Sequence, residues 1–340
     1  MSGGTRSRQA TIGMWLLLFI AAFWGLTFFS TKSLLNRMPV TDFLTVRFGL
    51  ATLLLIVVSP KSLRMPKPVL CKGAVIGVVF AAAELTQTFG LPHTSASISG
   101  FITGLYVVFT PLLGAAMFRA RLRPLVWGAV GLATVGLAVL SMRPSGAPLG
   151  FGEWVTLVSA VLWGLHITLV GRWSAPGDAM SLTITQTGVA SVIFLVGGLR
   201  DGLTLPQNSV DWIWMAYFAI IVGAVSEFAQ IWAQAHVEAT KAAILMVTEP
   251  LWASLFAVLF GGESVTWRLL TGGALMVAAM AMAVLAHGAQ AEVAGAEGHG
   301  APVDRGPTYP STRAGVAPAR TVTPGATAGA TSASPIGPNS

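Results

Sequence analysis

Charged residues and cysteine are both scarce in this sequence of 340 residues. Asp, Glu, Lys and Arg make up 10% of it, whereas a soluble domain usually carries about 25%. Because 54% of the residues are hydrophobic and the mean hydropathy is +0.72, the chain is expected to be an integral membrane protein with many spans. The single cysteine, Cys71, excludes a disulfide scaffold and a zinc or iron–sulfur site built from cysteines.

Catalytic signatures are missing as well. The sequence contains no Walker A motif, no H-E-x-x-H and no G-x-S-x-G, so ATP hydrolysis, zinc proteolysis and serine hydrolysis have no support. The net charge of +7 lies in short connectors between apolar stretches, which is typical of a membrane protein and not of a nucleic-acid-binding one. We therefore predict that the chain is not an enzyme and has no catalytic residue, cofactor, metal or nucleic-acid partner.

Ten apolar segments recur along the chain, each near the length of about 20 residues that a helix needs to cross a bilayer. In hydrocarbon, only helices and closed barrels satisfy the backbone, and these runs are too long for barrel strands. The sequence therefore predicts an all-α membrane protein with ten transmembrane helices. The segments are residues 12–33, 41–58, 73–91, 95–117, 125–142, 151–171, 181–199, 211–233, 240–260 and 269–287.

Residues 1–11 and 288–340 lie outside these segments, and the positions of Lys and Arg predict on which side of the membrane they lie. With the N-terminus inside, eleven basic residues lie on the inner side and five on the outer side. The inner set is Arg6, Arg8, Lys61, Arg64, Lys67, Lys72, Arg119, Arg121, Arg123, Arg172 and Lys241; the outer set is Lys32, Arg37, Arg143, Arg200 and Arg268. We expect a plasma membrane protein of the bacterial inner membrane, with both termini cytoplasmic and 288–340 a disordered tail.

The two halves of the sequence resemble each other. Three pairs of residues in similar short motifs share one offset of 139 residues: Trp24 with Trp163, Gly49 with Gly188, and Pro111 with Pro250. Glu84 and Glu227 match at an offset of 143, one helical turn more. Each half has five predicted spans, so the second half enters the membrane from the opposite side. Inverted repeats of this kind characterise secondary transporters, whose substrate site lies where the halves meet.

Several short motifs make the resemblance to a family specific. The Trp-Gly pairs in spans 1 and 6, Arg47–Phe48, Glu249–Pro250 and Gly262–Glu263, in this order, resemble the drug/metabolite transporter (DMT) superfamily, in its EamA-like transporter branch. The resemblance implies five-helix repeats at 12–142 and 151–287, and export of small polar metabolites such as amino acids or related compounds. The first half departs from the pattern, since Met117–Leu122 lacks the Gly-Glu pair that often ends span 4.

Other functions stay open from the sequence. A passive facilitator of the same fold fits equally well, and an uptake permease of the same fold is an alternative that the family resemblance favours less than export. An intramembrane enzyme acting on a lipid-linked substrate would need its carboxylates clustered at one depth, and a non-transporting scaffold would not need paired polar stripes. Partners beyond lipid and a small-molecule substrate are protons, if transport is proton-coupled, and a second copy of the chain. The GxxxG pairs Gly73/Gly77 and Gly100/Gly104 fit internal helix packing or such a homodimer.

Eleven residues inside the apolar spans are candidates for substrate binding or coupling. Four are ionisable, and a charge in hydrocarbon costs at least about 2.5 kcal/mol on insertion scales. The glutamines share helix faces with the glutamates or occupy a repeat position, and the aromatics lie too deep for interfacial anchors. Structural pairing or core packing is the alternative for each. The candidates are Arg47, Glu84, Gln87, Tyr106, Trp24, Trp163, Gln186, Glu227, Gln230, Glu249 and Trp252.

Arg47 and Glu84 are expected to form an ion pair. Span 2 runs inward and span 3 runs outward, which places the two residues within about 5 Å in depth at 1.5 Å per residue. Each charge alone would be costly in hydrocarbon, and pairing removes most of that cost. Gln186 occupies the place of the arginine beside Glu227, so Glu227 is expected to be the more easily protonated of the two glutamates.

Overall fold

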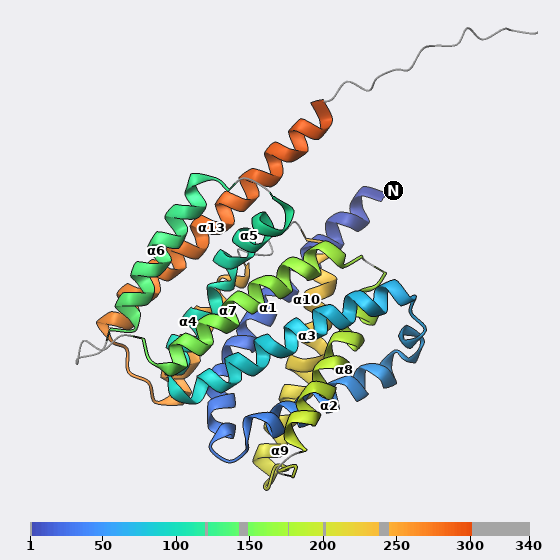
Figure 1. Ribbon diagram of the computed structural model, residues 1–340, viewed down its shortest axis with the longest axis vertical. Helices are drawn as coiled ribbons and strands as arrows, with labels where there is room; N and C mark the ends of the chain where they lie inside the picture. The colour runs from blue at the N-terminus through green and yellow to red at the C-terminus, as the bar shows by residue number, and fades with distance from the viewer. Residues whose placement is uncertain are drawn as a thin grey trace, which may run out of the picture. The chain divides into compact units, whose positions relative to one another are not determined.

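The structure is a computed structural model, and it describes residues 2–119, 122–142, 149–175, 177–199, 202–237 and 245–300. Residues Met1–Glu297 form one compact unit. Every regular element in the described part of the chain is a helix (Figure 1). The predicted disordered tail lies largely outside the described residues.

The helices are joined mostly by short connectors (Figure 1). The first half holds α1 (Ser2–Leu35), α2 (Val40–Val58), η1 (Pro60–Leu63), α3 (Lys67–Gly90), η2 (Leu91–His93), α4 (Ala96–Gly104), α5 (Tyr106–Phe118) and α6 (Pro124–Leu140). The second half holds α7 (Phe151–Trp173), α8 (Ala179–Gly198), α9 (Ser209–Tyr217), the π-helix η3 (Phe218–Ser226), α10 (Glu227–Gln234), α12 (Glu249–Gly261) and α13 (Trp267–Gly300). Helices α4 and α5 together make up a single span, and so do α9, η3 and α10.

Eight helical segments in the described residues are long and apolar enough to cross a membrane. They are Thr11–Leu35, Val40–Val58, Lys67–His93, Ala96–Phe118, Phe151–Trp173, Ala179–Gly198, Ser209–Gln234 and Trp267–Ala286. Two shorter apolar helices, α6 and α12, occupy the places of the predicted spans 125–142 and 240–260. The chain is therefore a multi-pass membrane protein. Helix α13 continues to Gly300, beyond the predicted boundary at residue 287.

Two of the predicted spans are irregular. The span from Ala96 to Phe118 changes from α4 to α5 at Leu105, and Pro111 lies inside α5, where its ring removes one backbone hydrogen bond. The span from Ser209 to Gln234 contains the wider turns of η3. Pro250 does not kink a helix, because α12 begins at Glu249 and proline is well tolerated in a first turn.

Glycines allow four helices to approach one another closely. A Cβ atom added at Gly25 of α1 would lie 2.5 Å from the Cβ of Trp252 and 2.8 Å from the backbone nitrogen of Ala253 in α12. A Cβ added at Gly164 of α7 would lie 2.9 Å from the Cβ of Phe109 in α5. The helix pairs α1–α12 and α5–α7 therefore pack backbone against backbone.

The GxxxG glycines are used within the chain. Gly73 and Gly77 face Thr185 and Gln186 of α8, and Gly100 and Gly104 both approach Pro250 of α12. A Cβ at any of these four positions would come within 3.0 Å of another atom; for Gly100 that atom is the Cβ of Ala253, at 2.6 Å. The interpretation as internal packing accounts for all four glycines.

Large apolar side chains cover the outside of the helices. Trp15 is 58% exposed, Leu53 62%, Ile213 68% and Leu270 62%, values that a soluble protein would rarely show in so many residues at once. The buried interior contains rings that meet edge to face, including Phe48 with Phe80 at 5.3 Å between centroids. An apolar exterior around a packed interior is what a lipid environment requires.

We expect Gly25→Ala to destabilise the protein, because α1 would have to move away from the α12 backbone. Overpacking of this kind typically costs about 1–3 kcal/mol. The matched control is Gly131→Ala in α6, where an added Cβ meets nothing within 4 Å, so the midpoint should be unchanged or slightly higher. Thermal denaturation of the purified variants in detergent measures the difference. Equal midpoints for the two variants would show that α1 and α12 do not pack this closely.

Candidate functional site

A cavity lies between helices from both halves of the chain. Its lining comes from α1, α2, α3, η2, α4, α5, α7, η3, α10 and α12 and from Met246 just before α12, and its empty volume, open mouth included, is about 610 Å³. The residues that line it are Trp24, Thr27, Phe28, Thr31, Arg47, Glu84, Gln87, Thr88, Leu91, Thr103, Tyr106, Trp163, Ile167, Val222, Glu227, Gln230, Met246 and Glu249. The cavity therefore combines buried charges, amides, hydroxyls and aromatic rings.

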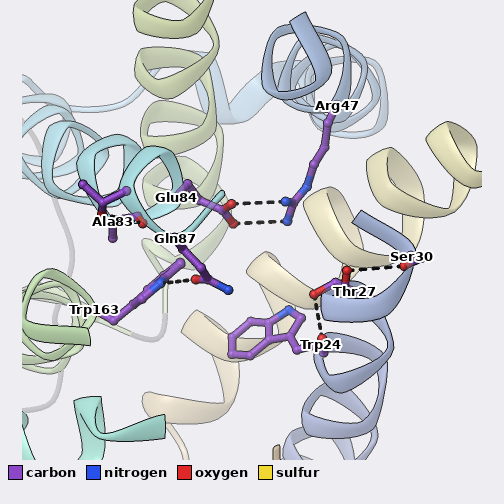
Figure 2. A network of polar contacts seen from close by, with 9 residues as sticks. Trp24, Thr27, Ser30, Arg47, Ala83, Glu84, Gln87 and Trp163 are labelled. Carbon is purple, nitrogen blue, oxygen red and sulfur yellow. Dashed lines mark hydrogen bonds and ion pairs between the residues drawn. The ribbon is translucent and has the colours of Figure 1, made fainter. Parts of the chain in front are cut away.

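Arg47 of α2 and Glu84 of α3 form a two-pronged ion pair in the wall of this cavity (Figure 2). Arg47 Nη1 and Nη2 donate to the two carboxylate oxygens of Glu84, each at 3.2 Å, and both residues are buried. The guanidinium carbon lies 4.5 Å from the ring centre of Phe48 and 5.4 Å from that of Phe218. The predicted pairing of Arg47 with Glu84 is confirmed.

Glu227 has a neutral partner in the corresponding place. The Gln186 side-chain nitrogen donates to Glu227 Oε2 at 3.0 Å, and the Gln186 oxygen lies 3.0 Å from His166 Nε2. All three residues are fully buried or nearly so. His166 fixes the orientation of the Gln186 amide through this contact, and it packs beside the rings of Phe80 and Trp163. Glu227 therefore accepts a hydrogen bond from a neutral amide and has no cationic partner in direct contact in the described structure.

The two tryptophans of the repeated Trp-Gly motif both line the cavity, yet only one has an amide partner. Trp163 Nε1 donates to Gln87 Oε1 at 2.6 Å (Figure 2). Gln230 occupies the related position near Trp24, and its amide oxygen is buried without a hydrogen-bond partner in the described structure. Within the described residues, the amide oxygen of Gln230 is thus an unpartnered buried atom of a residue that lines the cavity.

Glu249 and Tyr106 join the starts of two helices. The Tyr106 hydroxyl donates to Glu249 Oε2 at 3.0 Å, and both residues are buried. Tyr106 is the first residue of α5 and Glu249 the first of α12, so the carboxylate lies at a helix N-terminus, where the helix dipole favours negative charge. Helices that begin inside a membrane protein are typical of transporter binding sites.

Nine of the eleven candidate residues line the cavity, and two do not. Gln186 lies behind Glu227 and holds it through the hydrogen bond above. Trp252 packs against Gly25 and stacks on Phe256 at 5.9 Å between centroids, so its role here is helix packing. The sequence interpretation did not select the hydroxyls of Thr27, Thr31, Thr88 and Thr103.

Helix periodicity contained the signal for two of these threonines. Thr27 and Thr31 follow Trp24 at spacings of three and seven residues, which places all three on one face of α1. Thr103 lies close to the end of α4, and no periodic pattern of charged residues marks that helix. Within the described residues, no group of three or more His, Cys, Asp or Glu side chains is arranged to hold a metal ion.

Polar contacts away from the cavity join the two halves near one end of the helices. The Glu263 carboxylate accepts from the backbone N–H groups of Ala96 at 2.6 Å and Ser97 at 3.3 Å, which caps α4 from outside its own sequence. Arg37 donates to Asp211 at 2.6 Å, and this hydrogen bond raises the pKa of the Arg37 guanidinium. Both contacts link residues of different halves.

The fold and the cavity define a multi-pass membrane protein with a buried polar site, and comparison with known proteins defines its family. The model of the EamA-like transporter family matches residues 11–142 and again residues 150–285. The chain belongs to the EamA-like transporter family. It is a transporter with a small-molecule substrate and a lipid environment, as the sequence predicted, and it is not an enzyme.

Individual relatives are more distant. An uncharacterized transporter of Archaeoglobus fulgidus is 25% identical over 77% of this chain and 82% of its own length. One of Pseudomonas aeruginosa is 28% identical over 76% of this chain and 88% of its own length. A protein of Streptantibioticus cattleyicolor named a probable terminal-alkyne amino-acid exporter is 25% identical, over 38% of this chain and 47% of its own.

A solved crystal structure shares the fold. It superposes with a TM-score of 0.59 at 19% sequence identity and covers 82% of this chain and 98% of its own. At this identity the likeness supports the arrangement of the helices and carries no argument about a substrate.

We expect Arg47→Ala to lower the stability or transport of the protein more than the double variant Arg47→Ala/Glu84→Gln does. Removing one partner of a buried pair leaves an uncompensated charge, at a cost of about 3–5 kcal/mol, whereas the double variant leaves none. Thermal midpoints in detergent and transport in liposomes test this as a double-mutant cycle. Additive effects of the two substitutions would mean that the residues act separately.

Proposed function

We propose that this chain is a secondary transporter that exports small polar metabolites, such as amino acids or related compounds, by alternating access between two five-helix halves. The observation that carries the proposal is the cavity, which is lined by charged and polar side chains from both halves. Each buried polar group is costly in an apolar interior, and a binding site for a polar substrate accounts for their gathering around one cavity.

The two halves are proposed to be inverted repeats of five spans each, at 12–142 and 151–287, which makes ten transmembrane helices. The family model supports this by matching the chain twice in succession. Matched contacts support it as well: Arg47 with Glu84 corresponds to Gln186 with Glu227, and Gly164 against Phe109 corresponds to Gly25 against Trp252. An odd number of spans in each half then gives the two halves opposite directions.

The matched glycine contacts also favour a different register for the last helices of each half. Phe109 and Trp252 are 143 residues apart, as are the left-handed residues that end α5 and α12, Arg119 at φ +54° and Gly262 at φ +69°. Pro111 and Pro250, at 139 residues, would then not be equivalent. A shift of four residues is about one helical turn, which explains why the shorter offset looked acceptable in the sequence.

The structure bears on proton coupling and on the possible homodimer. Glu227 and Glu249 are carboxylates that could bind and release a proton during transport, which supports proton coupling over passive facilitation. The GxxxG glycines pack within the chain, so a homodimer would have to use another surface.

Orientation is proposed from the charge count, with both termini cytoplasmic in the bacterial inner membrane. The contacts Arg37–Asp211 and Glu263–Ala96 then lie at the outer end of the helices. Since both join one half to the other, they hold the cavity closed on that side, and alternating access requires them to break when the cavity opens outward.

A reporter enzyme that is active only outside the cytoplasm tests this orientation. Fused after Gln290 it should be silent, and inserted into the connector at residues 143–150 it should be active, because the Lys and Arg excess places the more basic set of connectors, on the opposite side from residues 143–150, in the cytoplasm. Activity of the reporter is measured in whole cells against fusion-protein abundance. The reverse pattern would invert the proposed topology.

Flux into proteoliposomes tests the function itself. We expect saturable movement of labelled amino acids or related metabolites, absent from liposomes without protein and lost in Arg47→Ala. Repeating the measurement with and without a pH gradient separates proton-coupled transport from facilitated diffusion, and reversing the gradient reports the preferred direction. If no amino acid or nucleoside moves in a saturable manner, a non-transporting scaffold would replace the proposed function.

A further inference from the structure

The charges that line the cavity do not balance among the described residues. Three carboxylates, Glu84, Glu227 and Glu249, share the lining with one cation, Arg47. Both terminal nitrogens of Arg47 are engaged by Glu84. Glu227 and Glu249 have only neutral partners in the described structure, an amide and a hydroxyl. The wall contributed by α10 and α12 therefore lacks positive charge.

The hydrogen-bonding capacity of that wall is also unbalanced. Gln230, 1% exposed, lies three residues after Glu227 on the same face of α10. Its amide oxygen has no partner, although buried polar atoms are nearly always satisfied. We call Glu227, Gln230 and Glu249 the acceptor wall, because each of its two carboxylates has one neutral hydrogen-bond donor and no cationic partner in the described structure.

Aromatic rings lie around the same space. Trp24, Trp163 and Tyr106 all line the cavity, and the faces of such rings attract cations. Neither the acceptor wall nor these rings favours an anionic group, and Arg47, the cation that would bind one, is held by Glu84 and packed against Phe48.

We propose that the cavity binds its substrate through a protonated amine, which donates to the acceptor wall, and that no carboxylate is required for recognition. The substrate class is small primary amines with a net positive charge or a zwitterion. This inference rests on the proposed transport function and specifies which end of the substrate the cavity recognises. The ammonium group supplies the three donors and the charge that the wall lacks.

Three forms of one amino acid test the proposal: leucine, leucinamide and N-acetylleucine, together with the same forms of alanine and lysine. Binding to the purified protein in detergent is measured by tryptophan fluorescence and by the shift in thermal midpoint. The carboxamides, which keep the amine and lose the anion, should bind at least as well as the free amino acids. The leucine and alanine N-acetyl forms, which lose the ammonium, should bind at least about tenfold more weakly, since a hydrogen bond to a charged group is lost.

Variants locate the preference in the acceptor wall. Glu227→Gln and Glu249→Gln should each reduce the ratio of carboxamide to N-acetyl affinity by about tenfold. The matched control is Asp42→Asn, because Asp42 is equally buried but binds the backbone N–H of Thr204 outside the cavity; it should keep the ratio of the unchanged protein. The N-acetyl forms also serve as internal controls for folding, because a misfolded variant loses all ligands alike.

The possible failures are distinguishable. Equal or tighter binding of N-acetylleucine and N-acetylalanine, or no binding of any amine, would overturn the proposal. So would an equal loss of the ratio in Asp42→Asn. If amino acids move in liposomes while their N-acetyl forms compete equally well, the transport function stands and the amine preference fails. If the preference is found in detergent but no solute moves in liposomes, the transport function fails instead.

Discussion

The ion pair between Arg47 and Glu84 is the interaction on which the site depends. Either charge alone would be costly in an apolar interior, and the pair offsets that cost because the two terminal guanidinium nitrogens meet the two carboxylate oxygens. This geometry fixes α2 against α3 at the depth of the cavity. It also positions the faces of Phe48 and Phe218 on the guanidinium, so the polar wall and the aromatic interior are held by the same side chain.

The neighbouring elements follow from the same constraint. A cavity inside hydrocarbon needs backbone that approaches it without a bulky side chain, and Gly25 and Gly164 bring α12 and α5 close enough to enclose it. The starts of α5 and α12 then lie beside it and supply Tyr106 and Glu249. The interior is organised so that every buried carboxylate of the cavity has a hydrogen-bond donor, charged in one instance and neutral in two.

Much of this organisation was predictable from the sequence, for a physical reason. A helix needs about 20 apolar residues to cross the hydrocarbon core, and this length marks the spans and the all-helical fold. A charge inside a span is costly, so the exceptions Arg47, Glu84, Glu227 and Glu249 stand out as candidates. The Arg47–Glu84 pair was predictable because α2 and α3 are consecutive and antiparallel, which makes relative depth a matter of counting residues.

Other features left no comparable mark in the sequence. The π-helix η3 and the start of α12 at Glu249 depend on tertiary packing. Neither feature changes the apolar composition from which a span is predicted. Trp252 was predicted to line the cavity, but side-chain direction is decided by the close approach of α1, where Gly25 leaves room for it. The role of Gln186 behind Glu227 required His166, which lies on a different helix and becomes a neighbour only on folding.

The difference between Arg47 and Gln186 makes the two sides of the cavity chemically unequal. Two identical halves related by inversion would offer a substrate the same wall twice, and a small asymmetric molecule would have no preferred orientation in it. Here the first half contributes a compensated carboxylate and the second an uncompensated one, with Gln230 unpartnered beside it. Arg47 on one side, and Gln186 held by His166 on the other, therefore give the cavity one carboxylate with a cationic partner and one with a neutral partner. In the proposed mode of binding, this difference lets the amine end of a substrate be recognised and leaves the other end free to vary.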